Sequence, residues 1–310
     1  MKSAEQITRQ IEKVIIGKHA VIEKAVITLL CNGHLLLEDV PGVGKTMLAK
    51  AIAKSIGGEF RRIQFTPDLL PSDITGSSVF NQKTMEFEFR PGPIFGNVVL
   101  ADEINRATPK TQSSLLEAME ERQVTTDGIT RNLPEPFFVI ATQNNVELTG
   151  TYPLPEAQLD RFFSRLTIGY PDKTAEAEIL HTQEVSHPIE TLTQVISPEE
   201  MRAMQDKVRH VGVSKEIREY IVEIVTATRN SNQIVLGSSP RGSLLLMHAA
   251  QGHAAVNANS FVTPDDVKAM APNVLAHRII PRADLRTRGV STDELIDEIV
   301  ASVRVPIPVA

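Results

Sequence analysis

The stretch PGVGKT combines two glycines with a lysine and a threonine, residue types that suit a loop around phosphate groups. The strict phosphate-loop pattern is G-x-x-x-x-G-K-[ST], and the chain departs from it by carrying Asp39 where the first glycine is expected. The apolar run HLLLE precedes the loop and the helical pattern TMLAKAIAKSI follows it, so amides at the helix start can bind phosphate oxygens. We therefore expect a nucleotide site that contains Pro41, Gly42, Val43, Gly44, Lys45, Thr46 and Met47.

Two acidic residues, Asp102 and Glu103, directly follow the apolar run NVVLA. Beside a phosphate loop, Lys45 would contact the β and γ phosphates, and the Thr46 hydroxyl would ligate Mg²⁺, which prefers oxygen ligands. Asp102 would hold the same ion through water, and Glu103 would orient and deprotonate an attacking water. An Asp-Glu pair after a strand also caps helices, so it is the nearby phosphate loop that favours ATP hydrolysis.

A third polar group, Asn144, ends the apolar run FFVIAT. At the end of a strand next to the acidic pair, its amide would position the same water molecule. The alternative is an ordinary turn residue, a role for which asparagine is well suited.

The order of apolar runs and helical patterns indicates how these residues are positioned. Runs of strand length alternate with helical patterns to about residue 170, which is typical of a mostly parallel sheet covered by helices. Later in the chain, Ser197, Thr263 and Ser291 each precede acidic residues and mark helix starts. We predict an α/β domain over residues 1–190 and a small all-α domain over 191–310. The expected strands are 34–38, 60–65, 97–101, 137–142 and 165–169.

Composition excludes some classes of function. The net charge of −6 and a pI near 5.8 argue against constitutive binding to nucleic acid or to an anionic membrane. No run approaches about 18 consecutive apolar residues, so we expect no membrane insertion and a cytoplasmic location. The single cysteine, Cys31, lies in an apolar run and is interpreted as a buried hydrophobic residue. His248 and His253 are five residues apart, which does not match a helical zinc pair.

With these features identified, the chain resembles the AAA+ ATPases, and among them the MoxR family. The resemblance rests on an ordered set of blocks that spans nearly the whole chain: LLLEDVPGVGKT, PSDITG, FEFRPGPIF, LADEINRATPKTQSSLLEAMEE, VIATQN, YPLPEAQLDRF and SPRGSLLL. The form EDVPGVGKT looks ordinary for this family, which implies that Asp39 leaves the nucleotide site intact. The resemblance implies a P-loop NTPase core that uses ATP, ADP and Mg²⁺.

The resemblance also implies roles that spacing alone does not give. Asn144 matches sensor 1, and Arg161 matches the arginine finger that enters the neighbouring subunit's site, with Arg165, one helical turn further on, as the second choice. Arg241 matches sensor 2, through which the helical lid would detect the γ phosphate, and Ile16 and Gly17 resemble a segment near adenine.

Two further segments resemble parts of the ring's inner surface. Residues 77–93, which contain Phe80, Phe87, Phe89 and Arg90, look like the helix 2 insert, and VTTDGITRNLP looks like the hairpin before sensor 1. Substrate contact and ordinary hairpin packing explain the aromatic residues of the insert equally well.

The family implies a hexameric ring that remodels or matures protein clients, often with a partner that has a von Willebrand factor A domain. A metal-chelatase motor subunit is an alternative with a similar core. Two alternatives from other classes are a DNA translocase, against which the acidic charge argues, and a nucleotide-gated scaffold that binds ATP with little turnover.

Overall fold

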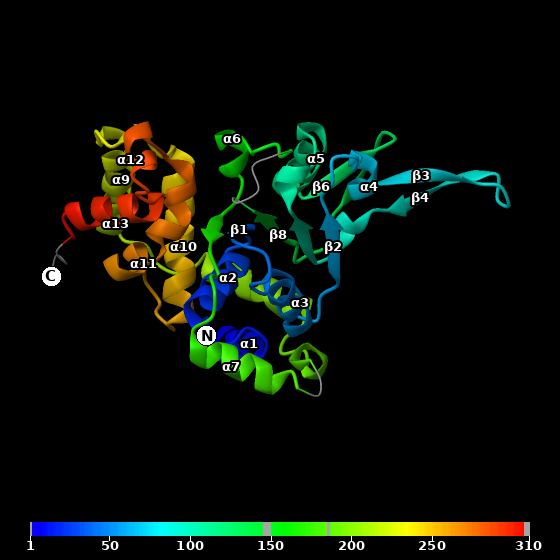
Figure 1. The fold of residues 1–310 in the computed structure, drawn as a ribbon, viewed down its shortest axis with the longest axis horizontal. Coiled ribbons are helices and arrows are strands. Elements are labelled where there is room, and N and C mark those ends of the chain that lie inside the picture. The colour runs from blue at the N-terminus through cyan, green and yellow to red at the C-terminus, as the bar shows by residue number, and fades with distance from the viewer. Residues whose placement is uncertain (1, 145–149, 185–186, 307–310) are drawn as a thin grey trace.

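The computed structural model describes residues 2–144, 150–184 and 187–306, and its α/β part is built on a single sheet (Figure 1). The strand order is β2, β5, β8, β1 and β9, and every neighbouring pair is parallel. The predicted five-stranded sheet is confirmed, with strand ends shifted by at most one residue except at β9, which is shorter than expected. The strands are β1 (Leu35–Glu38), β2 (Phe60–Gln64), β5 (Val98–Asp102), β8 (Phe138–Gln143) and β9 (Ser164–Leu166).

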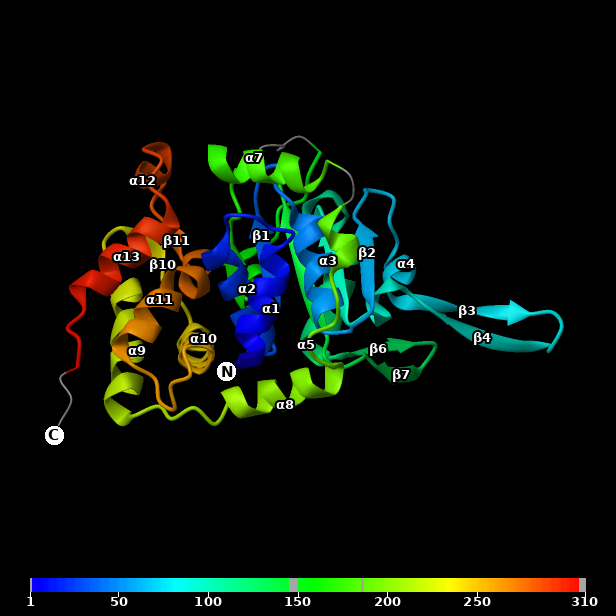
Figure 2. The same cartoon turned by 90° about the horizontal axis from the view of Figure 1, so that it is seen from below.

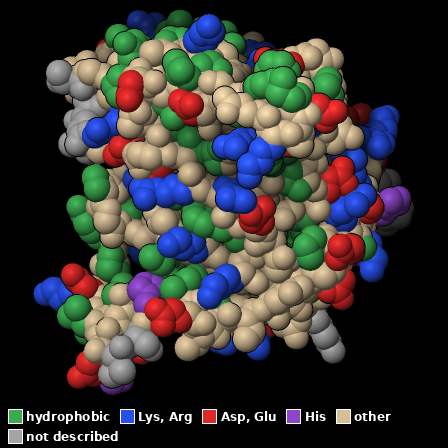
Figure 3. Space-filling view, turned by 90° about the vertical axis from the view of Figure 1, so that its right-hand side faces the viewer, with side chains coloured by type: hydrophobic (Ala, Val, Ile, Leu, Met, Phe, Trp, Pro, Cys, Tyr) green, Lys and Arg blue, Asp and Glu red, His purple; other side chains and the backbone are tan. Residues whose placement is uncertain are grey.

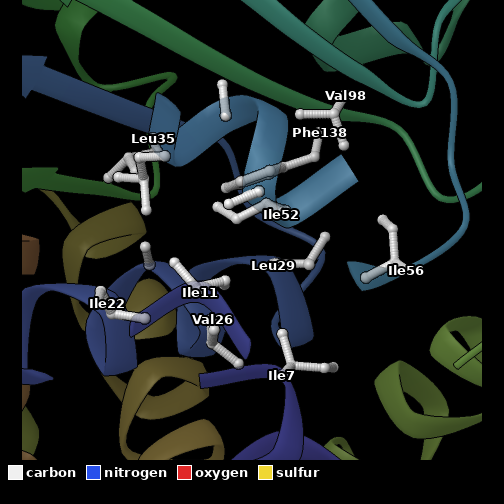
Figure 4. Packing of buried hydrophobic residues seen from close by; sticks show 14 of the residues in the cluster. Ile7, Ile11, Ile22, Val26, Leu29, Leu35, Ile52, Ile56, Val98 and Phe138 are labelled. Atoms are coloured by element: carbon white, nitrogen blue, oxygen red, sulfur yellow. The ribbon is translucent and has the colours of Figure 1, made fainter. Parts of the chain in front are cut away.

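Helices cover both faces of the sheet because alternate residues of each buried strand point to opposite sides. On one face, Leu35 and Leu37 belong to a cluster with α1 (Lys2–Glu12), α2 (His19–Leu30) and α3 (Lys45–Ser55). Figure 4 shows part of this cluster, including Leu35, at close range. On the other face, Leu36 belongs to a cluster that includes residues of α4 (Pro71–Thr75) and α5 (Pro109–Glu121). The short helices of this part are η1 (Pro93–Phe95), η2 (Ile104–Arg106) and α6 (Glu156–Leu159).

After β9 the chain crosses back along the α/β part before it reaches the C-terminal helices. It forms α7 (Lys173–Thr182), η3 (Pro188–Thr191) and α8 (Pro198–Val208). Figure 2 shows α8 beside α1, and its Met201 and Met204 share a hydrophobic cluster with α1, α2 and α3. Although α8 follows the expected boundary at residue 190, it packs on the α/β part.

The C-terminal helices enclose a second hydrophobic cluster, to which α9 contributes Ile217, Tyr220, Ile221, Ile224 and Val225 at helical spacing. The capping boxes predicted at Ser197, Thr263 and Ser291 are confirmed. A short antiparallel pair, β10 (Ile234–Leu236) with β11 (Ile280–Pro281), is an element that the sequence did not predict. The helices are α9 (Lys215–Asn230), α10 (Pro240–Val256), α11 (Pro264–Leu275), η4 (Ala276–Arg278), α12 (Ala283–Thr287) and α13 (Thr292–Ser302).

Cys31 packs between α2 and the C-terminal helices and donates a hydrogen bond to the carbonyl of His248, at 3.2 Å. Burial raises the pKa of its thiol to about 12, which favours the unreactive protonated form. His253 pairs with Asp266, at 2.6 Å. Within the described ranges, no three His, Cys, Asp or Glu side chains are grouped to hold a metal, and no helix is long and apolar enough to cross a membrane.

Two antiparallel hairpins extend from the α/β part. The longer one joins β3 (Gly76–Asn81) to β4 (Glu86–Pro91), and the shorter one joins β6 (Gln123–Thr126) to β7 (Ile129–Asn132). They coincide with the segments that resemble the helix 2 insert and the hairpin before sensor 1. Figure 1 shows β3 and β4 projecting well beyond the helices.

Gly33 provides the space in which the chain before β9 packs against the chain before β1. A Cβ atom on this glycine would lie 2.3 Å from both Cβ and Cγ of Phe163, whose amide is fixed by a hydrogen bond to the His34 carbonyl. We expect Gly33→Ala to lower the free energy of unfolding by about 1–3 kcal/mol, because a well-packed contact has no room to adjust. Urea unfolding measures this loss.

The matched control is Gly212→Ala, whose new Cβ would meet its nearest atom, the Ser260 carbonyl oxygen, at an ordinary 3.5 Å. It should change stability by less than about 0.5 kcal/mol. Equal losses in the two variants would show that the contact with Phe163 is not the cause.

Candidate nucleotide-binding site

The carboxyl ends of the parallel strands bring the expected nucleotide-binding residues to one edge of the sheet. The phosphate loop follows Glu38 at the end of β1, Asp102 ends β5 and precedes Glu103, and Asn144 follows β8. Because β8 lies between β1 and β5, Asn144 at its end lies between the phosphate loop and the acidic pair. The side chain of Asn144 is buried. This is the edge of open α/β sheets at which ligands usually bind.

The backbone of the phosphate loop has the conformation that its glycines permit. Gly42 and Gly44 have φ values of 87° and 94°, and a side chain at Gly42 would meet nothing within 4 Å. Gly44 is the N-cap of α3, whose first residues are Lys45 and Thr46, and no side chain caps this helix start. The first amides of α3 are therefore available for an anion, while Lys45 Nζ donates to the Asp39 carbonyl at 2.8 Å.

Asp39 has a structural role that explains why glycine is absent from this position. One of its carboxylate oxygens accepts hydrogen bonds from the amides of Ile168 and Gly169, at 2.6 and 2.7 Å, and the other accepts from Val40, at 2.9 Å. The carboxylate thus ties the start of the loop to the chain that leaves β9. A glycine would leave these three amides without this acceptor.

We expect Asp39→Ala to lower the free energy of unfolding by about 2–3 kcal/mol, because three amides lose a charged acceptor. Denaturant unfolding with a fluorescent-nucleotide titration measures both stability and the organisation of the loop. The control is Glu178→Ala, which removes an exposed carboxylate from α7. Equal stability of the two variants would contradict the anchoring role of Asp39.

A pocket of about 330 Å³ lies next to the loop. It is bounded by the turn between α1 and α2, by the loop and by α7, and its lining is largely apolar. Its lining includes the expected Ile16, Gly42, Val43, Gly44 and Met47, together with Ile168, Ile179 and His187, which the sequence did not indicate. The size and lining suit a flat aromatic base. Gly17, at φ 73°, lies beside the pocket and against Ala175.

The two acidic residues at the end of β5 are held in different ways. Asp102 accepts a hydrogen bond from the Thr142 hydroxyl at 2.7 Å and pairs with Arg62 at 2.6 Å. Glu103 adopts the left-handed conformation, with φ 57° and ψ 51°, and its amide donates to Thr142 at 2.8 Å. A left-handed backbone is a strained conformation for a residue other than glycine.

The carboxylate of Glu103 contacts two neighbours at the same edge of the sheet. It accepts a hydrogen bond from the side-chain amide of Gln64, at 3.0 Å, and pairs with Arg106, at 3.1 Å. Sequence reasoning missed Arg62 and Gln64. Their place in β2 was a usable signal, because the carboxyl end of that strand meets the same edge.

Of the three arginines singled out by the sequence, Arg161 and Arg241 lie away from the phosphate loop. Arg161 precedes β9, so it lies at the amino edge of the sheet, opposite the phosphate loop. In Figure 1, α6, which ends just before Arg161, and α7, which borders the pocket beside the loop, lie at opposite ends. Arg241 joins it there, because both arginines pair with Glu120, at 3.1 and 3.0 Å. The match of Arg241 to sensor 2 stays a prediction, and the structure places this side chain beside Arg161 at the amino edge.

Arg165 lies in β9 and not one helical turn beyond Arg161, so that part of the prediction is wrong. Its side chain pairs with Glu38 at 3.2 Å and donates to Thr292 at 2.9 Å, and it also pairs with Asp293. Arg165 therefore connects the end of β1, next to the phosphate loop, with the start of α13. This position agrees with the strand expected over 165–169, although that strand ends at Leu166.

Comparisons with known proteins agree with this geometry. The family model "ATPase family associated with various cellular activities (AAA)" matches residues 34–164, and the AAA lid domain model matches residues 226–299. The chain superimposes with a TM-score of 0.91 on the crystal structure of a presumed ATPase from Cytophaga hutchinsonii, at 37% identity, covering 99% of this chain and 96% of that one.

Curated relatives cover nearly the whole chain. An uncharacterized protein, YeaC of Bacillus subtilis, is 55% identical over 96% of this chain and 93% of its own length. Chaperone MoxR1 of Mycobacterium tuberculosis is 40% identical over 96% of this chain and 81% of its own, and protein MoxR of Paracoccus denitrificans is 31% identical over 94% and 93%. With its phosphate loop, five-stranded sheet and helical lid, this chain belongs to the MoxR family of AAA+ ATPases.

Proposed function

We propose that this protein hydrolyses ATP at sites formed between neighbouring subunits of a ring and uses the energy to remodel protein clients. One observation carries the proposal: the phosphate loop and acidic pair lie at one edge of the sheet, and Arg161 lies at the other. A neighbouring subunit in the same orientation would bring its amino edge, with Arg161, to this nucleotide site.

The nucleotide site would bind ATP or ADP through separate groups for phosphate and base. The amides of the loop and Lys45 would hold the phosphates once Lys45 leaves the Asp39 carbonyl. The pocket beside Ile16 and Met47 would hold the adenine.

The residues at this edge also fit Mg²⁺, because the Thr46 hydroxyl and the Asp102 carboxylate are oxygen donors of the kind that the ion prefers. Bound Mg²⁺ would neutralise charge on the phosphates. Arg62, which pairs with Asp102, would give up that contact when the ion is held.

Glu103 is proposed as the general base for the attacking water, with Asn144 as the amide that positions this water. The carboxylate would need to leave Gln64 and Arg106 to reach the water. The left-handed backbone at Glu103 supports a functional role, because such a conformation in a residue other than glycine costs free energy and recurs at active sites.

The contact between subunits joins two different surfaces, so it must close into a ring or continue as a helix. The family favours oligomers, and we propose a hexamer. Arg161 and Arg241 would both reach the nucleotide of the neighbouring subunit and stabilise charge on the transferred phosphoryl group. Shared placement at the amino edge supports a common role for the two arginines.

Protein clients would contact the hairpin of β3 and β4. Phe80 and Phe87 pair across the strands, with ring centroids 5.3 Å apart, yet their exposed fractions are 43% and 74%. Phe89, by contrast, packs on Phe95 and under Arg131, so only part of the aromatic set is hairpin packing.

Figure 3 shows the face of the molecule from which this hairpin projects, and there Lys and Arg side chains are interspersed with acidic and hydrophobic ones. Such a mixed surface suits protein better than DNA. The name of Chaperone MoxR1, a relative at 40% identity, also supports protein clients. We also propose that the protein works with a partner that has a von Willebrand factor A domain. Its proposed location is the cytoplasm.

The proposal is tested by measuring steady-state ATP hydrolysis across protein concentrations while light scattering reports particle size. Specific activity should rise as a ring-sized species forms, and Lys45→Ala should abolish nucleotide binding and turnover. Activity that does not depend on concentration would indicate a monomeric NTPase instead. ATP binding without turnover in the ring-sized species would indicate a nucleotide-gated scaffold.

A further inference from the structure

Glu120, near the end of α5, connects two arginines from distant parts of the chain. One carboxylate oxygen lies 3.1 Å from Nε of Arg161, and the other lies 3.0 Å from Nη1 of Arg241. Arg161 belongs to the segment before β9, whereas Arg241 lies in the first turn of α10 among the C-terminal helices. The carboxylate holds together two cations that would otherwise repel each other.

These contacts leave donor groups of both arginines available to a ligand. Arg161 uses Nε, and among the described residues neither of its terminal nitrogens has a hydrogen-bond partner. Arg241 uses Nη1 for Glu120 and directs Nε towards Asp160 at 3.8 Å, so its Nη2 is also uncommitted within the described ranges. With exposed side-chain fractions of 32% and 39%, both arginines are accessible from outside the chain. An anion can therefore be bound without breaking either contact with Glu120.

A buried arginine fixes the surroundings of this pair. Arg278, in η4, has a side chain that is only 1% exposed and pairs with Asp160 at 2.8 Å. It also donates to the carbonyl of Phe162, which directly follows Arg161. The segment that contains Asp160 and Arg161 is thus attached to the C-terminal helices on one side, while Glu120 attaches it to α5 on the other.

We propose that Glu120 is a positioning residue that orients Arg161 and Arg241 as one anion-binding unit for the γ phosphate of a neighbouring subunit. This inference rests on the proposed function, since it requires a nucleotide site between subunits. Because the pair spans the α/β part and the C-terminal helices, its geometry depends on how these two parts are placed. Through Glu120, the two arginines would contact the γ phosphate only when the α/β part and the C-terminal helices are correctly placed.

The test is ATP hydrolysis by assembled full-length Glu120→Gln, which keeps the side-chain shape and removes the charge. We expect kcat to fall at least tenfold while nucleotide affinity and assembly size change less than twofold, because the altered groups lie at the far edge from the phosphate loop. Glu121→Gln, in the exposed neighbouring residue, is the control and should keep wild-type kcat. An unchanged or raised kcat in Glu120→Gln would overturn the proposal, and a raised value would identify Glu120 as an inhibitor of the arginines.

A second set of variants separates positioning from a general structural effect. In an Arg161→Ala, Arg241→Ala background, Glu120→Gln should reduce kcat by less than a further twofold, because its targets are gone. A full additional tenfold loss would refute action through the arginines. Glu120→Asp, which retains the charge, should recover part of kcat, and failure to exceed Glu120→Gln would also count against the inference. If Arg161→Ala alone keeps wild-type turnover, the proposed function fails at that step independently of Glu120.

Discussion

Glu103→Gln is expected to reduce kcat for ATP hydrolysis by at least about 100-fold, the usual contribution of a general base. Nucleotide affinity should stay within about threefold of wild type, because the loop and the adenine pocket do not use Glu103. Glutamine has the same shape and can keep a contact with Gln64, but it cannot accept a proton from water. Steady-state kinetics with a fluorescent-nucleotide titration measures both quantities.

The substitution also suits the backbone at this position. Glu103 has a positive φ, at which changes in side-chain branching or size would add strain, whereas glutamine is nearly isosteric. Glu117→Gln, an exposed change in α5, serves as the control and should keep wild-type turnover. Unchanged turnover in Glu103→Gln would assign the base to another group, and lost nucleotide affinity would instead indicate damage to the loop.

The sheet and the phosphate loop were predictable from sequence because their signals are local. Buried parallel strands appear as continuous apolar runs, and the loop is recognised by glycines at fixed spacing before Lys45. Helix starts such as Ser291 were equally clear, since a capping box involves residues only three positions apart. Each of these features depends on a few neighbouring residues.

The features that sequence did not predict depend on distant contacts. The position of Arg241 is set by Glu120, which lies 121 residues away, and nothing near either residue indicates their pairing. Asp39 appeared to be a tolerated departure from a pattern until its bonds to the amides of Ile168 and Gly169 showed an anchoring role. The contacts of Arg165 with Glu38 and Asp293 likewise join residues 127 and 128 positions apart, which no local pattern indicates.

Mixing two inactive variants should restore ATP hydrolysis, if Arg161 acts on the neighbouring subunit. Lys45→Ala removes the phosphate-binding lysine but keeps Arg161, whereas Arg161→Ala keeps an intact phosphate loop. In a ring with head-to-tail contacts, about one quarter of the interfaces in a random equal mixture would combine an intact loop with an intact Arg161. Turnover should therefore reach up to about one quarter of wild type if the sites act independently.

The same experiment distinguishes Arg161 from Arg165. The side chain of Arg165 contacts Glu38 in its own subunit, directly before the phosphate loop, so a defect in Arg165→Ala lies in the subunit that binds the nucleotide. A mixture of Arg165→Ala with Lys45→Ala should show no recovery, because neither variant has both an intact loop and an intact Arg165. Recovery in this mixture, with none in the Arg161→Ala mixture, would show that Arg165, and not Arg161, acts on the nucleotide of the neighbouring subunit. Recovery with Arg161→Ala alone would place Arg161 at the interface and leave Arg165 as the connection between β1 and α13.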